Sequence, residues 1–324
     1  MKQTTEMTPR ERFLAALERR PIQGRVPHFE LVFFLTMEAF GRVHPSQRAY
    51  GQWAQMSETE RELHRRDVAD LYVQSVSRFE LSGTIYDVPW GWTDEDTRLS
   101  LEHVRRLDGL NHILGLHGDT TYGLPDGAHM MDFIVELSEQ PQEMKDKAQR
   151  AVDAALERAR RIREWGTVDC FFLCSDYCFN DNPFLSPPMF DEFVTPYLKQ
   201  LVAGYRALGF YVVKHTDGNI MPILDSLVAC EPHALHSLDP QGGVDIAEVK
   251  RRVGDKVCLI GNVNCAALQT GTDEEVAASV RYALRHGMPG GGYVFGTSNC
   301  IYTGMALKRY EFMLDIWRRE GNYE

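Results

Sequence analysis

The chain has 324 residues, of which 44% are hydrophobic and 25% are charged, as in an ordinary globular protein. Its 46 acidic and 35 basic residues give a net charge of −11, which argues against a nucleic-acid-binding surface or a general attraction to anionic membranes. The 7 cysteines, an N-terminus without an apolar signal segment and the lack of a stretch of about 18 apolar residues predict a cytoplasmic protein with reduced thiols and no membrane-spanning helix.

The first predicted element is a helix in the segment "TPRERFLAALERR", residues 8–20. Thr8 is suited to cap this helix, Pro9 to begin its first turn, and Glu11 to complete a capping box. Pro21 lies just beyond its expected end. The chain should therefore open with a helical extension ahead of the first strand.

Short apolar segments then alternate with longer helical patterns. The eight candidate strands are residues 25–34, 70–76, 112–118, 170–176, 209–215, 234–239, 256–262 and 291–298. This alternation predicts parallel strands joined by helices. Eight strands with no break at the midpoint favour a single (β/α)8 barrel domain over residues 1–324, rather than a doubly wound sheet.

The segment 39–67 has the pattern of a helical insertion after the first strand, in a position to cover the mouth of the barrel. In (β/α)8 barrels the chemistry gathers on the loops that follow the carboxyl ends of the strands. Polar residues directly after the apolar segments are therefore the candidate site residues.

The segment "VVKHTDGNI", residues 212–220, ends an apolar run with a histidine and an aspartate two positions apart. Alternate residues of an extended segment point the same way, so His215 and Asp217 are expected to face the mouth together. Imidazole and carboxylate groups bind zinc or a related divalent ion. The alternative is that Asp217 caps the following helix and His215 bonds to nearby backbone.

Other strand ends supply further candidates. His117 and Asp119 could form an acid–base pair, with helix capping by Asp119 as the alternative. Asp176 and Tyr177 lie at the end of the fourth candidate strand, and Asn262 lies at the end of the seventh. All of these are expected at the same end of the barrel.

Two strand ends leave a choice open. Asp239, in "SLDPQGG", either joins the site or merely begins a turn. In "VFGTSNCIY", Cys300 would complete a His/Asp/Cys ligand set with an open fourth position. The alternative is that Asn299 faces inward and Cys300 is buried behind it as an ordinary core thiol.

Four segments together resemble the uroporphyrinogen decarboxylase superfamily. They are "PFLSPPMFDEFVTPYLKQLV" (183–202), "KHTDGNIMPILDSL" (214–227), "DIAEVKRRVGDKVCLIGNVN" (245–264) and "GGYVFGTSNCI" (291–301). The resemblance implies a single (β/α)8 barrel with its site at the C-terminal mouth. The superfamily has at least two chemistries.

The decarboxylase branch acts without a cofactor on a porphyrinogen that carries several carboxylates. Its N-terminal signature is an arginine-rich M-R-Q-A-G-R stretch, whereas this chain reads "PHFELVFFLTMEAFGR" there. Paired arginines are the natural partners of a polycarboxylate, so their absence argues against porphyrinogen decarboxylation.

The second branch consists of cobamide-dependent methyltransferases, whose zinc motif is H-x-C-G-N with a later cysteine in P-G-C-G-I. This chain is similar at His215 but has Asp217 in place of the first cysteine. Aligning Ile301 with the later motif places Asn299 at the second cysteine and Cys300 one residue after it. Oxygen ligands make a metal site harder, so such a site would suit an ether, phenol or carboxylate oxygen rather than a thiol.

The resemblance therefore implies a corrinoid-linked methyltransferase that acts on a small molecule at a zinc-assisted site. The expected catalytic residues are His215, Asp217, Asp176 and Tyr177, the expected substrate-binding residues are Asn262, Asp239, His117 and Asn299, and the expected metal ligands are His215, Asp217 and Cys300. A separate corrinoid protein would be the partner, and the superfamily often forms homodimers.

Two alternatives remain open from the sequence. A cofactor-free decarboxylase would use Asp217 to stabilise a developing cation, His215 to transfer a proton, and arginines such as Arg25, Arg42 and Arg78 to bind the acid. A non-catalytic binding protein would keep the barrel without a competent site.

Overall fold

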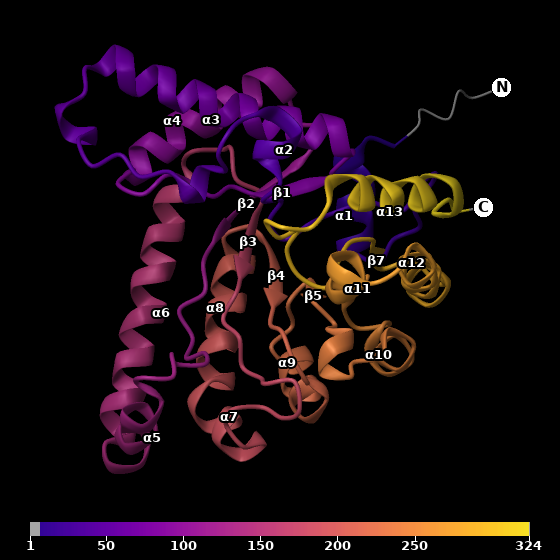
Figure 1. Cartoon of the computed structure of the whole chain (residues 1–324). Coiled ribbons are helices and arrows are strands. Elements are labelled where there is room, and N and C mark those ends of the chain that lie inside the picture. Colours follow the sequence, from indigo (N-terminus) through magenta and orange to yellow (C-terminus); the bar gives the residue numbers. More distant parts are fainter. Residues whose placement is uncertain (1–6, 324) are drawn as a thin grey trace.

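The computed structural model describes residues 7–323, and its centre is a parallel sheet of seven strands in the order of the sequence (Figure 1). The strands are β1 (Gly83–Ile85), β2 (Ile113–His117), β3 (Cys170–Leu173), β4 (Tyr211–His215), β5 (Ala234–His236), β6 (Cys258–Ile260) and β7 (Tyr293–Val294). Sequential order with parallel neighbours is the topology of a TIM-barrel-like α/β fold. The expected α/β class is confirmed, whereas the expected eight strands are seven.

The missing strand is explained by the first candidate segment, residues 25–34. Residues in it hydrogen-bond to both edges of the sheet without forming a regular strand. The amide of Phe29 donates to Phe295 O over 2.9 Å, and the amide of Ser82 donates to His28 O over 2.7 Å. The segment therefore lies between β7 and the residues that lead into β1.

The second candidate strand, residues 70–76, is wrong because it lies inside the helix α3 (Glu58–Phe79). Ser57 and Glu60 form a capping box at the start of that helix. Its buried residues, which include Val68, Leu71, Tyr72, Val76 and Phe79, recur at the three- and four-residue spacing of a helix rather than alternating. The true strand β1 has only three residues and begins with a glycine, which gives too weak a pattern to recognise.

Helices precede β1, fill the connections between the strands and follow β7 (Figure 1). Besides α3 they are α1 (Pro9–Leu17), α2 (Thr36–Phe40), α4 (Asp94–Asp108), α5 (Met130–Glu139), α6 (Pro141–Arg163), α7 (Pro187–Phe193), α8 (Thr195–Ala207), α9 (Leu224–Ala229), α10 (Ile246–Val253), α11 (Cys265–Thr270), α12 (Asp273–Gly287) and α13 (Leu307–Glu320). No helix within residues 7–323 is both long and apolar enough to cross a membrane.

The predicted first helix is confirmed, with Thr8 and Glu11 forming its capping box. Its Phe13 and Leu17 belong to an inner apolar cluster with strand residues such as Phe172 and Val213. Arg10 binds Asp169, which precedes β3, over 2.7 Å. The helix α1 therefore packs at the amino ends of the strands and leaves their carboxyl ends for the site.

The segment predicted as a helical insertion has little helix before α3. It contains two short 3-10 turns, at Pro45–Gln47 and Trp53–Gln55. Its backbone pairs with the loop after β1, since the amide of Trp90 donates to Arg48 O over 2.9 Å. The insertion therefore covers the loop that follows β1.

Candidate functional site

Three side chains with metal-binding atoms converge at the carboxyl ends of β3 and β4. They are Asp176, His215 and Asp217, whose ligand atoms all lie within 4.8 Å of one another. His215 is the last residue of β4, and Asp217 follows it by two positions. Asp176 lies three residues beyond β3, and its Oδ1 accepts a hydrogen bond from the amide of Asp217 over 3.0 Å. This hydrogen bond between a side chain and a backbone amide holds the two strand ends together.

Two atoms of this cluster are poised for a ligand. Nε2 of His215 lies 3.7 Å from Asp176 Oδ1 and 3.9 Å from Asp217 Oδ1, which is too far for hydrogen bonds. Oδ1 of Asp217 is buried and has no hydrogen-bond partner among the described residues. Buried polar atoms are normally paired. One imidazole nitrogen and two carboxylates form a donor set that a divalent ion such as zinc accepts, so these residues fit a metal.

The electrostatics of the cluster also suit a cation. Burial raises the pKa of Asp217 to about 7, and the neighbouring carboxylates of Asp176 and Asp239 add to this rise, while the Ser237 hydroxyl opposes it. Burial lowers the pKa of His215 to about 3. The imidazole is therefore neutral at pH 7, as a metal ligand must be. A cation would relieve the repulsion among the carboxylates.

Asn299, rather than Cys300, contacts the cluster. Its Nδ2 donates a hydrogen bond to Asp217 Oδ2, which leaves Oδ1 as the unpartnered oxygen. Cys300 is buried in the inner apolar cluster and is not among the residues whose ligand atoms converge. Asp176, rather than Cys300, thus supplies the third of the converging ligand atoms.

Asp239 begins a turn, which is one of the two roles between which the sequence left a choice. Its Oδ1 accepts a hydrogen bond from the amide of Gln241 over 2.9 Å and so begins the turn after β5. Burial raises its pKa, and the charge of Asp176 adds to the effect. Asp239 therefore contributes negative charge near the cluster while its side chain caps a turn.

A buried ion pair lies behind the cluster, on the opposite face of β4. The fully buried Lys214 donates to Asp119 over 2.7 Å and to Ser175 O over 2.9 Å. Asp119 also accepts from the amide of Ser175 over 3.0 Å. These contacts fix the backbone just before Asp176. Asp119 is thus part of this support, and it does not pair with His117.

Tyr177 faces the same layer as Lys214, away from Asp176. Its ring packs 4.1 Å from the Lys214 ammonium group, and its hydroxyl lies 2.5 Å from Thr121 Oγ1. The tyrosine, which was expected to be catalytic, therefore lies behind the strands rather than in the cluster.

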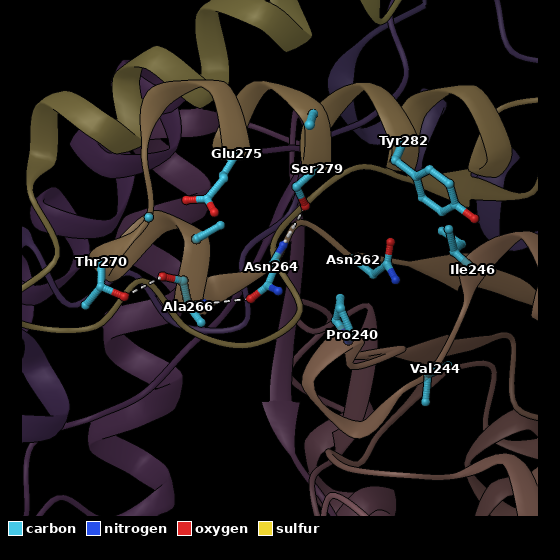
Figure 2. Close-up of a pocket in the computed structure, with 13 residues that line it drawn as sticks. Pro240, Val244, Ile246, Asn262, Asn264, Ala266, Thr270, Glu275, Ser279 and Tyr282 are labelled. Carbon is cyan, nitrogen blue, oxygen red and sulfur yellow. Dashed lines mark hydrogen bonds between the residues drawn. The ribbon is translucent and has the colours of Figure 1, made fainter.

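Asn262 lines an open groove of about 760 Å³ between α10, α11 and α12 (Figure 2). Its Nδ2 donates to Leu238 O over 2.8 Å. Asn264 lies beside it and caps α11 through the amide of Ala266. The expected substrate-binding asparagine thus borders this groove.

His117 forms a separate polar pair with Asp87, the second residue after β1. Its Nε2 lies 2.9 Å from Asp87 Oδ1. Partial burial acts to lower the pKa of His117, but the neighbouring Asp87 carboxylate outweighs this effect and raises it. The ring is half-exposed, so it lies at an accessible edge of the mouth.

Two further residues lie near the site: His236, a polar strand-end candidate to which the sequence analysis assigned no role, and Asp87, which was not predicted. His236, the last residue of β5, lies beside His215, with their Nδ1 atoms 2.8 Å apart. A strand-final histidine followed by an aspartate occurs twice, in "KHTD" and "LHSLD". This repeated pattern could have indicated that the two histidines lie side by side. Asp87 was missed because β1 was placed in the wrong segment.

The sheet and its cluster define a TIM-barrel-like α/β protein with a candidate metal site at the carboxyl ends of its strands. The family model described as uroporphyrinogen decarboxylase (URO-D) matches residues 126–320, more than half of the chain. The protein therefore belongs to the uroporphyrinogen decarboxylase family, as the resemblance implied.

Individual relatives are distant. A uroporphyrinogen decarboxylase of Thioalkalivibrio sulfidiphilus is 27% identical over 144 residues, which cover 42% of this chain and 39% of the relative. One of Neisseria gonorrhoeae (strain NCCP11945) is 32% identical over 160 residues, 46% of this chain and 38% of the relative. The chain thus spans about two fifths of the length of these relatives.

Solved structures agree over a longer span. A methyltransferase from Methanosarcina mazei superposes with a TM-score of 0.74 at 16% identity, covering 97% of this chain and 99% of that one. A GH5_18 protein from Bifidobacterium longum subsp. infantis gives a TM-score of 0.50 at 11% identity, covering 93% and 80%. At these identities the likeness establishes the fold alone.

Proposed function

We propose that the protein is a corrinoid-linked methyltransferase, which moves a methyl group to or from a small molecule at a metal site formed by Asp176, His215 and Asp217. The observation that carries the proposal is the convergence of these three donors, with a buried Asp217 oxygen that has no partner in the described structure. The likeness in fold to a methyltransferase and the motif around His215 support the same branch of the family.

The donor set favours an oxygen-centred substrate. Two carboxylates and one imidazole form a harder site than a thiolate-rich one, so its cation prefers oxygen to sulfur. When bound, zinc would supply Lewis acidity that stabilises negative charge on the oxygen that gains or loses the methyl group. An ether or phenol oxygen is therefore the proposed reacting group.

The side chains around the cluster orient the donors. Asn299 holds one oxygen of Asp217 by hydrogen bonding and leaves the other directed into the cluster. Asp176 accepts from the amide of Asp217, which fixes the loops after β3 and β4 relative to each other. Such fixed donors need little rearrangement when a charged group develops beside them.

Family membership makes a cofactor-free decarboxylase the second candidate. A polycarboxylate substrate requires free cationic groups. The three arginines considered for this role are paired with carboxylates, Arg25 with Glu80, Arg42 with Asp67 and Asp70, and Arg78 with Glu311. These pairs favour the methyltransferase proposal over the decarboxylase.

A corrinoid assay tests the proposal. Zinc-loaded protein would be mixed with reduced cobalamin and a panel of aryl methyl ethers, and separately with methylcobalamin and phenols or thiols. The absorbance of the corrinoid reports methyl transfer in either direction. We expect transfer with an oxygen compound and its loss in Asp217→Asn. Unchanged corrinoid absorbance in every combination, together with carbon dioxide release from uroporphyrinogen, would contradict the proposal and establish the decarboxylase.

A further inference from the structure

The candidate ligand His215 shares a buried hydrogen bond with a second histidine. His215 and His236 end two adjacent parallel strands and lie opposite each other in the register. Their Nδ1 atoms are 2.8 Å apart. Both residues are almost completely buried, since His215 is 4% exposed and His236 is 1% exposed. Only one proton can lie between two nitrogen atoms at this distance, so one ring donates and the other accepts.

The direction of this hydrogen bond decides whether His215 can bind a cation. A histidine that binds a cation through one ring nitrogen must be neutral, and a neutral imidazole carries a single N–H proton. If His236 donated, the proton of His215 would lie on Nε2 and block the atom that faces Asp176 and Asp217. If His215 donates from Nδ1, its Nε2 lone pair is free to face the two carboxylates.

We propose that His236 is a positioning residue that accepts the Nδ1 proton of His215 and so holds the His215 Nε2 atom ready for a divalent metal. This inference rests on the proposed function, because it concerns the same metal site. A ligating histidine commonly donates its second N–H to an acceptor that fixes its tautomer and ring orientation. Here the acceptor is another neutral imidazole.

In the described part of the chain, His236 is the one hydrogen-bond partner of the His215 ring. Phe29 also packs against His236, with the two rings edge-on and their centroids 5.8 Å apart. The ring of His236 is thus held by its contacts with His215 and Phe29.

The second nitrogen of His236 is consistent with this direction. When Nδ1 accepts, the proton of His236 must lie on Nε2. That atom is buried and has no hydrogen-bond partner within residues 7–323, so no donor there forces the His236 proton onto Nδ1.

Zinc affinity in two variants of His236 tests the inference. Competition with a chromogenic chelator gives the dissociation constant of zinc for each protein. His236→Phe keeps the size of the ring but removes the acceptor, and we expect zinc to bind about 10–100-fold more weakly. His236→Asn keeps a polar acceptor near the Nδ1 position and should restore most of the affinity. Thermal unfolding of the zinc-free proteins controls for damage to the fold.

Nitrogen-detected NMR of histidine-labelled wild type gives a second readout that needs no variant. With zinc bound, His215 should carry its proton on Nδ1 and His236 on Nε2. A proton on Nδ1 of His236 in the zinc-bound protein would overturn the inference. So would equal zinc affinity in wild type and His236→Phe, although the metal site itself would then stand. Wild type that binds no zinc would remove both the metal site and this role of His236.

Discussion

At the scale of single residues, the site depends on a carboxylate placed where its charge is unfavourable. Burial raises the pKa of Asp217 to about 7, whereas the pKa of His215 is lowered to about 3. The proton on Asp217 therefore competes with a metal near neutral pH, and His215 does not compete. An ordinary surface aspartate would be ionised throughout this range.

This competition predicts a pH-dependent zinc affinity. Below pH 7 the cluster must release the Asp217 proton to bind zinc, so the affinity should fall by about tenfold for each pH unit of acidification. Above pH 7 the curve should level off. Chelator competition between pH 5.5 and 8 measures it. Asp217→Asn should bind weakly with a flatter profile, and a wild-type affinity that is constant below pH 7 would refute the raised pKa.

The residue scale also shows where the sequence was insufficient. His215, Asp217 and Asp176 were named from their positions after apolar runs, and the structure brings them together. Tyr177 was named for the same reason, but it faces the opposite layer from Asp176. The backbone of a loop has no fixed alternation, so sequence alone could not separate these two neighbours.

At the scale of the elements, the ends of β3 and β4 are held by the buried pair of Lys214 and Asp119. Removing one member of a buried ion pair leaves an uncompensated charge. We expect Lys214→Met to lower the free energy of unfolding by about 3–5 kcal/mol, measured by urea denaturation. The exposed Lys199→Met on α8 is the matched control and should cost under about 0.5 kcal/mol. Equal effects of the two variants would show that the pair does not support the strand ends.

The accuracy of the sequence prediction also varied between elements. The strands β2 to β7 were predicted because each apolar run is flanked by clear helical patterns. The strand β1 was missed, since its three residues follow the long amphipathic helix α3, whose apolar residues resembled a strand over 70–76. Residues 25–34 were predicted to form a strand, but they lie between β7 and the residues that lead into β1 without forming a regular strand.

At the scale of the whole molecule, several buried histidines make the fold sensitive to acid. Burial lowers the pKa of His44 and His233 to about 4 and that of His215 to about 3, and it also lowers the pKa of His236. The unfolded chain would protonate these rings near pH 6.5, whereas the folded chain does not. Asp217 and Asp239 act in the opposite sense, since their pKa values are raised in the folded state.

The metal-free protein should therefore lose stability as the pH falls from about 6.5 towards 4. Each proton taken up on unfolding contributes about 1.4 kcal/mol per pH unit, and four histidines outweigh two carboxylates. Urea denaturation at pH 7, 6 and 5 in the presence of a chelator measures the slope. His44→Asn should reduce this slope by the contribution of about one proton. A stability that is constant or rises between pH 7 and 5 would contradict the assignment of neutral buried rings.

The most direct test of the metal site is elemental analysis of untagged wild-type protein and of Asp217→Ala after incubation with zinc and gel filtration. The cluster of Asp176, His215 and Asp217 predicts near-stoichiometric zinc in wild type and little or none in the variant. Wild type that retains no zinc, or a variant that retains as much as wild type, would contradict a metal site at these three residues.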